Sequence, residues 1–64
     1  MWHEDQFVTL LRTRWPSELA QTEELLEASG ITYELVELFD GEEFEFRVAE
    51  TMLRAAREVL GLEG

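Results

Sequence analysis

The chain has 64 residues, of which 45% are hydrophobic, and a formal net charge of −10 at pH 7. A chain of this length makes one small domain, and its apolar fraction argues against disorder, which combines high charge with low hydrophobicity. The absence of cysteine excludes disulfides and thiolate-ligated metal sites, and the single His3 cannot build a histidine-rich metal site.

No segment approaches the roughly 20 consecutive apolar residues that a membrane-spanning helix needs. Residues 1–5 lack the basic start and the apolar run of a signal peptide. We therefore expect a cytoplasmic protein without a membrane partner.

Residues 4–14 are compatible with two structures. Phe7, Leu10 and Leu11 have helical spacing behind an acidic start, which suits an amphipathic helix. Residues 7–11 also have the composition of a short strand with both faces buried, as in a parallel sheet. Periodicity alone cannot decide between the two for so short a run.

The sequence predicts a helix over residues 17–29. Pro16 is tolerated in a first helical turn, Ser17 can contribute to the cap, and Glu18 meets the positive end of the helix dipole. Gly30 supplies a left-handed stop. We expect Trp15 to pack beneath the helix start, and the inward stripe to consist of Leu19, Thr22, Leu25 and Leu26.

Residues 31–48 have the pattern of a β-hairpin. Residues 31–39 are β-branched, aromatic and roughly alternating, which is typical of a strand. Asp40-Gly41 is typical of a two-residue type I′ turn, which needs positive φ at both positions. Residues 42–48 alternate cleanly, and the side chains on one face are Phe44, Phe46 and Val48.

A two-residue loop fixes the register of this hairpin. Glu34 lies opposite Arg47, which is a favourable opposite-charge pair. Glu37 lies beside Phe44, an unfavourable contact that predicts a bulge or a longer loop near the tip. The other pairs in this register are Phe39–Glu42, Leu35–Phe46 and Tyr33–Val48.

A final helix is predicted over residues 49–60, ended by Gly61. Arg54 can form i,i+4 pairs with Glu50 and Glu58 on the exposed side. The inward face is expected to consist of Met52, Ala55, Ala56, Val59 and Leu60.

The chain continues from residues 7–11 to Trp15-Pro16-Ser17-Glu18, then to Leu25-Leu26-Glu27-Ala28-Ser29-Gly30-Ile31-Thr32-Tyr33 and a strand. This arrangement resembles the opening β-α-β unit of glutaredoxins and related thioredoxin-fold proteins, over residues 7–38. In that family a strand leads to Cys-Pro-x-Cys at a helix start. The resemblance implies a strand at residues 7–11 and a shortened scaffold of the same type. Both redox cysteines and the later cis-proline are missing, so thiol–disulfide activity is excluded.

These elements predict a single domain over residues 1–64 in the order β-α-β-β-α. Its class is α/β, with helices packed on one face of a three-stranded sheet that contains the hairpin at 31–48. If residues 4–14 are helical, the order becomes α-α-β-β-α and the class α+β.

The net charge lies in the middle of the chain. Residues 1–14 and residues 47–64 each balance their acidic and basic side chains. Residues 15–46 contain no basic residue, and a surface of this kind repels nucleic acid and anionic membranes but attracts a basic partner. The ten acidic residues of this middle segment are Glu18, Glu23, Glu24, Glu27, Glu34, Glu37, Asp40, Glu42, Glu43 and Glu45.

The sequence offers no catalytic or metal-binding constellation. His3 has no motif that would supply it with a nucleophile and an orienting group. The hairpin carboxylates do not have the spacing of an EF-hand calcium loop; they are Asp40, Glu42, Glu43 and Glu45. We therefore expect no enzyme activity and no cofactor.

The leading hypothesis is an acidic protein-binding module, an inhibitor or nucleic-acid mimic of the kind encoded by phages. Carboxylates two apart on a strand lie about 6.7 Å apart, close to the spacing of successive phosphates. Trp2 can anchor a partner through its large apolar side chain. The predicted partner-binding residues are Trp2, Glu23, Glu24, Glu27, Glu34, Glu43 and Glu45. The alternative is a structural or assembly protein that forms a homo-oligomer, such as a homo-dimer, through an apolar edge.

Overall fold

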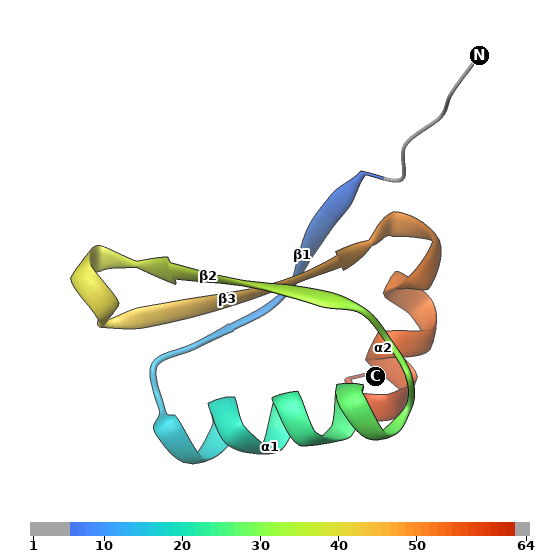
Figure 1. Cartoon of the computed structure of the whole chain (residues 1–64), viewed down its shortest axis with the longest axis horizontal. Coiled ribbons are helices and arrows are strands. Elements are labelled where there is room, and N and C mark those ends of the chain that lie inside the picture. Colours follow the sequence, from blue (N-terminus) through green and yellow to red (C-terminus); the bar gives the residue numbers. More distant parts are fainter. Residues whose placement is uncertain (1–5, 63–64) are drawn as a thin grey trace.

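The computed structural model describes residues 6–62 and has the predicted order β-α-β-β-α (Figure 1). Predictions for Trp2 and His3 lie outside the described residues. The strands are β1 (Phe7–Thr13), β2 (Tyr33–Leu38) and β3 (Glu43–Ala49). The helices are α1 (Pro16–Ala28) and α2 (Leu53–Leu60), and single 3₁₀ turns lie at Phe39–Gly41 (η1) and Glu50–Met52 (η2).

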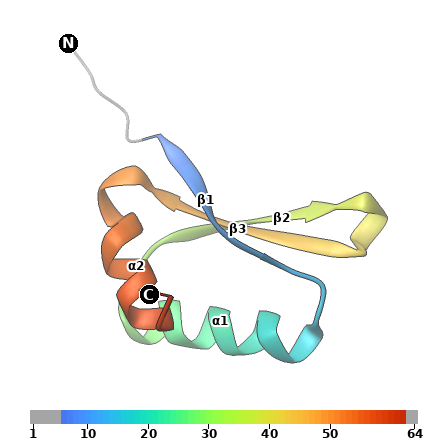
Figure 2. The same ribbon diagram turned by 180° about the vertical axis from the view of Figure 1, so that it is seen from behind.

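The three strands form one sheet in the order β1-β3-β2, and β3 pairs antiparallel with both neighbours. Both helices lie on the same side of this sheet in the two opposite views (Figures 1 and 2), as predicted. The opposite side carries no helix in the part of the chain that the structure describes. The architecture is a small α+β domain with one covered and one open sheet face.

The strand predicted at residues 7–11 is confirmed and extends to Thr13. The expected parallel environment with both faces buried is wrong, because β3 lies between β1 and β2. β1 is therefore an edge strand with an antiparallel neighbour, and Thr9 is exposed. The β-α-β unit is present, but its two strands are separated by β3.

A β-bulge explains why residues 4–14 are ambiguous in the sequence. The pairing of β1 with β3 shifts between Thr9 and Leu11, so Leu10 is an extra residue. The adjacent Leu10 and Leu11 both contribute to the helix-covered side: Leu10 is buried, and Leu11 packs against the core. The bulge breaks the alternation expected of a strand, because Leu10 and Leu11 share the helix-covered side while Phe7, opposite Ala49, lies on the open side.

The predicted register of the β2–β3 hairpin is confirmed. Glu34 lies opposite Arg47, and the ladder continues without a shift to its last pair, Leu38–Glu43. Residues 39–42 are thus the connection, which is the longer loop predicted from Glu37 beside Phe44. The remaining predicted strand pairs, Tyr33–Val48 and Leu35–Phe46, are also present.

The predicted type I′ turn at Asp40-Gly41 is present, and Phe39 before it is also left-handed. Asp40 and Gly41 have the predicted positive φ, 55° and 89°. Phe39 also has a positive φ, 52°, which costs an L-residue about 1–2 kcal/mol. The Glu42 amide donates to the Phe39 carbonyl over 3.1 Å, which is the hydrogen bond expected for a turn centred on Asp40-Gly41.

α1 begins at Pro16, and the residue before it, Trp15, is hydrogen-bonded to the preceding strand. The amide of Trp15 donates a hydrogen bond to the buried hydroxyl of Thr13 over 3.1 Å. No side chain caps this helix end. The expectation that Trp15 packs beneath the helix start is wrong, because its side chain is 60% exposed. Of the predicted inward stripe, Thr22 and Leu26 are buried, Leu19 is half-buried and Leu25 is 36% exposed.

α1 ends in a Schellman motif at Gly30, as predicted from its left-handed preference. Gly30 has φ 70°; its amide donates to the Glu27 carbonyl and the Ile31 amide to the Leu26 carbonyl. Ile31 and Leu26 are both buried, which is the apolar contact that usually accompanies this motif.

α2 repeats this ending at Gly61, where the Leu62 amide donates to the Arg57 carbonyl over 2.8 Å. Its predicted Arg54–Glu58 ion pair is present at 3.9 Å. The predicted inward position of Met52 is wrong, because Met52 lies in η2 and is 37% exposed. No helix within residues 6–62 is long and apolar enough to cross a membrane.

The core lies between the helices and the covered sheet face. Phe46 and Val48 on the central strand are fully buried, and Tyr33 from β2 contacts the Phe46 ring at a centroid distance of 5.5 Å. The buried apolar residues are Leu10, Leu26, Ile31, Phe46, Val48 and Ala56.

The left-handed conformation of Gly30 gives a test of the α1 ending. Gly30→Ala is expected to lower the free energy of unfolding by about 1–2 kcal/mol, because a side chain at this φ is strained. No atom within 4 Å would meet the added Cβ, so crowding adds nothing. Gly30→Asn should lose less, because Asn adopts this conformation more readily. Urea unfolding measures both, and an alanine variant as stable as the parent would contradict this account.

Candidate functional site

Carboxylates that are exposed or half-buried gather on the elements from α1 to the start of β3, and we call these nine side chains the acidic surface. α1, β2 and the 39–42 turn contain no basic residue. None of the nine forms an ion pair with another residue of the described range 6–62. They are Glu18, Glu23, Glu24, Glu27, Glu34, Glu37, Asp40, Glu42 and Glu43.

Five of the predicted partner-binding residues belong to the acidic surface. Glu23, Glu24 and Glu27 lie on α1. Glu34 and Glu43 lie on β2 and β3, on the open sheet face. Glu24, Glu27 and Glu34 are exposed, whereas Glu23 and Glu43 are half-buried. Two groups therefore result, one on the helix side and one on the open face, and they meet at the β2 edge.

Glu45 does not belong to this surface, although the sequence placed it there. Its side chain is only 7% exposed. It accepts a 2.5 Å hydrogen bond from the Thr9 hydroxyl and forms ion pairs with Arg12 at 3.4 Å and Arg47 at 3.3 Å. Glu45 thus links side chains of β1 and of its own strand on the open sheet face. We call Glu45 with these partners the internal anchor.

This arrangement lowers the pKa of Glu45 below its ordinary value. The hydrogen bond from Thr9 is the main cause, and the charges of Arg12 and Arg47 act in the same direction. Burial opposes them. Glu45 therefore remains ionised at neutral pH and neutralises cationic charge within the domain.

Because Glu45 is paired, β3 does not carry the predicted row of carboxylates at phosphate-like spacing. Glu43 is followed on the same face by the neutralised Glu45 and then by the cation Arg47. The sequence predicted an attraction between Glu34 and Arg47. In the structure, the ion pair of Arg47 is with Glu45. Repeating negative charges at phosphate spacing are therefore not available on this strand.

The sequence analysis did not predict that Thr9 and Arg12 of β1 bind Glu45. Arg12 lies opposite Glu45 only because the bulge shifts the β1 register by one residue. A sequence shows the opposite charges of Arg12 and Glu45, but it does not show which β1 residue faces which β3 residue. Without that register, Glu45 resembled the other carboxylates of the middle segment.

Tyr33 connects the helix carboxylates to the sheet. Its hydroxyl donates a 2.9 Å hydrogen bond to Glu27. Burial, this hydrogen bond and the nearby charges of Glu23 and Glu27 raise the pKa of Tyr33 to about 12. Glu23 and Glu27 therefore lie close to the start of β2, on the helix side of the sheet.

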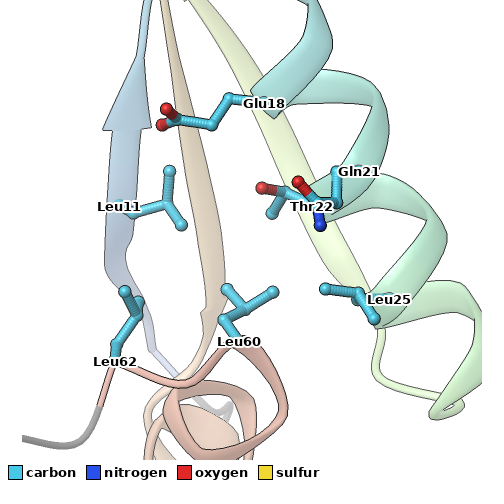
Figure 3. Close-up of a pocket in the computed structure, with 7 residues that line it drawn as sticks. All are labelled: Leu11, Glu18, Gln21, Thr22, Leu25, Leu60 and Leu62. Atoms are coloured by element: carbon cyan, nitrogen blue, oxygen red, sulfur yellow. The ribbon is translucent and has the colours of Figure 1, made fainter.

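A hollow of about 240 Å³ lies between α1, β1 and the end of α2 (Figure 3). Leu11, Leu60 and Leu62 point into it from one side and Leu25 from the other. Among the described residues that line it, only Glu18 is ionisable. This volume lies below the about 300–1,000 Å³ that is usual for small-molecule sites.

Within residues 6–62, no three histidine or carboxylate side chains converge as metal ligands do. Comparisons of the chain with protein-family models, with curated proteins and with solved structures gave no match. The resemblance of residues 7–38 to glutaredoxins therefore stays a prediction.

Replacing Glu45 tests the internal anchor. Glu45→Gln removes the charge that balances the buried Nε of Arg47, so we expect a loss of about 1–3 kcal/mol in the free energy of unfolding at neutral pH. The folded-state pKa is lowered, so this stabilisation is complete above the unfolded-state pKa, about 4.3, and disappears as the pH falls through the folded-state pKa.

The measurement is urea unfolding of the parent and the variant at neutral and acidic pH. Glu34→Gln is the matched control, because Glu34 is an exposed carboxylate on the same sheet face. It should change the stability by no more than a few tenths of a kcal/mol. A Glu45→Gln loss that persists unchanged in acid would contradict the ionised anchor.

Proposed function

We propose that this chain is a non-catalytic acidic binding module that docks on a basic surface of another protein. The observation that carries the proposal is the unpaired state of the acidic surface among the described residues. Carboxylates that only stabilised the fold would form ion pairs with the chain's own arginines. Here Arg12 and Arg47 neutralise Glu45, and Arg54 pairs with Glu58, so these arginines are committed elsewhere.

The sign of the charge supports a protein partner. A surface with nine unpaired carboxylates repels nucleic acid and anionic lipid headgroups. It attracts lysine- and arginine-rich proteins and accelerates their encounter with the domain. If the basic surface of the partner itself binds an anionic ligand, the module competes for it and acts as an inhibitor.

Mimicry of a regular phosphate row is not part of this proposal, because Glu45 is buried and paired. Complementarity to a basic protein does not require regular spacing. It requires unpaired charge of one sign, which α1, β2 and the 39–42 turn supply.

Charge reversal tests the proposal. The double variant Glu24→Arg/Glu34→Arg changes two exposed, unpaired members of the acidic surface. The matched control, Glu50→Arg/Glu58→Arg, makes the same net change on η2 and α2. We expect the first variant to lose at least about tenfold in affinity for the partner and the control to lose far less, because the effect is local at moderate salt.

The partner is obtained by capture from a lysate of the source organism, and its affinity is then measured by calorimetry at about 0.05 and 0.3 M salt. Exposed ion pairs are screened by salt, so the affinity of the parent should fall steeply between the two. A tight complex that is indifferent to salt, or equal losses in both variants, would contradict binding through the acidic surface.

Homo-oligomer formation remains the second candidate, favoured by the exposed apolar side chains. Phe39 is 67% exposed and Trp15 is 60% exposed. Light scattering over a range of protein concentrations tests it directly. A stable oligomer together with no captured partner would favour an assembly role over the binding module.

A further inference from the structure

We propose that the free edge of β2 binds an extended basic segment of the partner by strand addition. This inference rests on the proposed function, because it specifies how a basic protein would engage the acidic surface. The occupant is a stretch of partner chain that alternates arginine or lysine with apolar residues and pairs with the β2 backbone.

The edge of β2 is geometrically ready for another strand. β2 is the last strand in the order β1-β3-β2, and no described segment lies along its outer side in either view (Figures 1 and 2). In an antiparallel pair, alternate residues point their backbone amide and carbonyl groups away from the partner strand. A sheet edge of this kind is a template for another chain.

The two edges of the sheet differ in a way that favours β2. β1 carries a bulge at Leu10, and bulges twist an edge and interrupt its pairing. β2 pairs with β3 over six consecutive residues without a shift. It contains no proline and no basic residue, so an incoming basic strand meets a regular ladder of backbone groups.

The charges beside β2 select the chemistry of that strand. Glu34 projects on the open face, and Glu37 projects on the helix side, opposite Phe44. Glu23 and Glu27 of α1 lie near Tyr33, also on the helix side. Side chains two apart on the incoming strand are about 6.7 Å apart. Arginine or lysine on either of its faces would therefore meet carboxylates, with no cation on β2 or α1 to compete.

The same charges disfavour a second copy of this chain. When two β2 strands pair antiparallel with Glu34 opposite Glu34 of the second copy, a like-charge pair forms on the open face, and like charges directly opposite destabilise a sheet. The remaining charge of the two acidic domains adds to this repulsion. The edge therefore suits a basic partner better than itself.

Leu35 supplies apolar surface for the added strand. It lies on the helix side of β2, opposite Phe46, yet it is 39% exposed. A strand beside β2 would cover it.

The experiment uses the whole chain and two synthetic peptides of alternating arginine and valine. The second peptide has alternate backbone nitrogens methylated, which keeps the charge but removes the donors needed for pairing. Binding is measured by calorimetry, and NMR hydrogen exchange follows the amides of residues 33–38. We expect the first peptide to bind at least about tenfold more tightly than the second and to protect β2 amides from exchange.

Two variants localise the effect. Leu35→Arg places a cation on the β2 edge, and Met52→Arg makes the same charge change at η2, where Met52 is 37% exposed. Leu35→Arg should weaken the first peptide by at least about fivefold, and Met52→Arg by less than about twofold.

The outcomes separate this inference from the proposed function. Equal, salt-dependent binding of both peptides would retain the acidic module but overturn strand addition. Protection at β1 instead of β2 would also overturn it. Failure of both peptides to bind even at low salt would remove the attraction on which the proposed function itself depends.

Discussion

The fold depends on the central strand β3, which pairs with a strand on each side. Its two faces carry side chains of different kinds. Phe46 and Val48 point toward the helices and are fully buried. Glu45, which directly precedes Phe46, points to the open face and forms ion pairs with Arg12 from β1 and Arg47 from its own strand. One strand thus supplies both the apolar core and the ionic link across the β1–β3 pair.

This ionic link also determines where the charge of the domain can act. Two of the five arginines are bound to Glu45 and a third to Glu58, all outside α1, β2 and the 39–42 turn. None of the carboxylates of those elements forms an ion pair with a described residue. A domain with a net charge of −10 is in this way divided into a balanced part and a strongly acidic part. The acidic part borders the regular edge of the sheet.

Local signals predicted much of the fold. Asp40-Gly41 and the alternation of residues 42–48 gave the hairpin register, and Gly30 gave the end of α1. The bulge at Leu10 was beyond the sequence, because it arises from pairing with a strand more than thirty residues away. The burial of Glu45 depends on that register, so the candidate site was predicted in outline but included one residue that serves the fold. The exposure of Trp15 shows that size and apolarity alone do not place a side chain in a core this small.

The division of charge can be measured without knowing the partner. Paramagnetic relaxation of backbone amides by a cationic nitroxide, compared with a neutral one, reports the local surface potential. The account predicts the greatest excess relaxation from the cation along α1, β2 and the 39–42 turn, with little around Glu45 and α2. An excess spread evenly over the domain, or centred on Glu45, would contradict it.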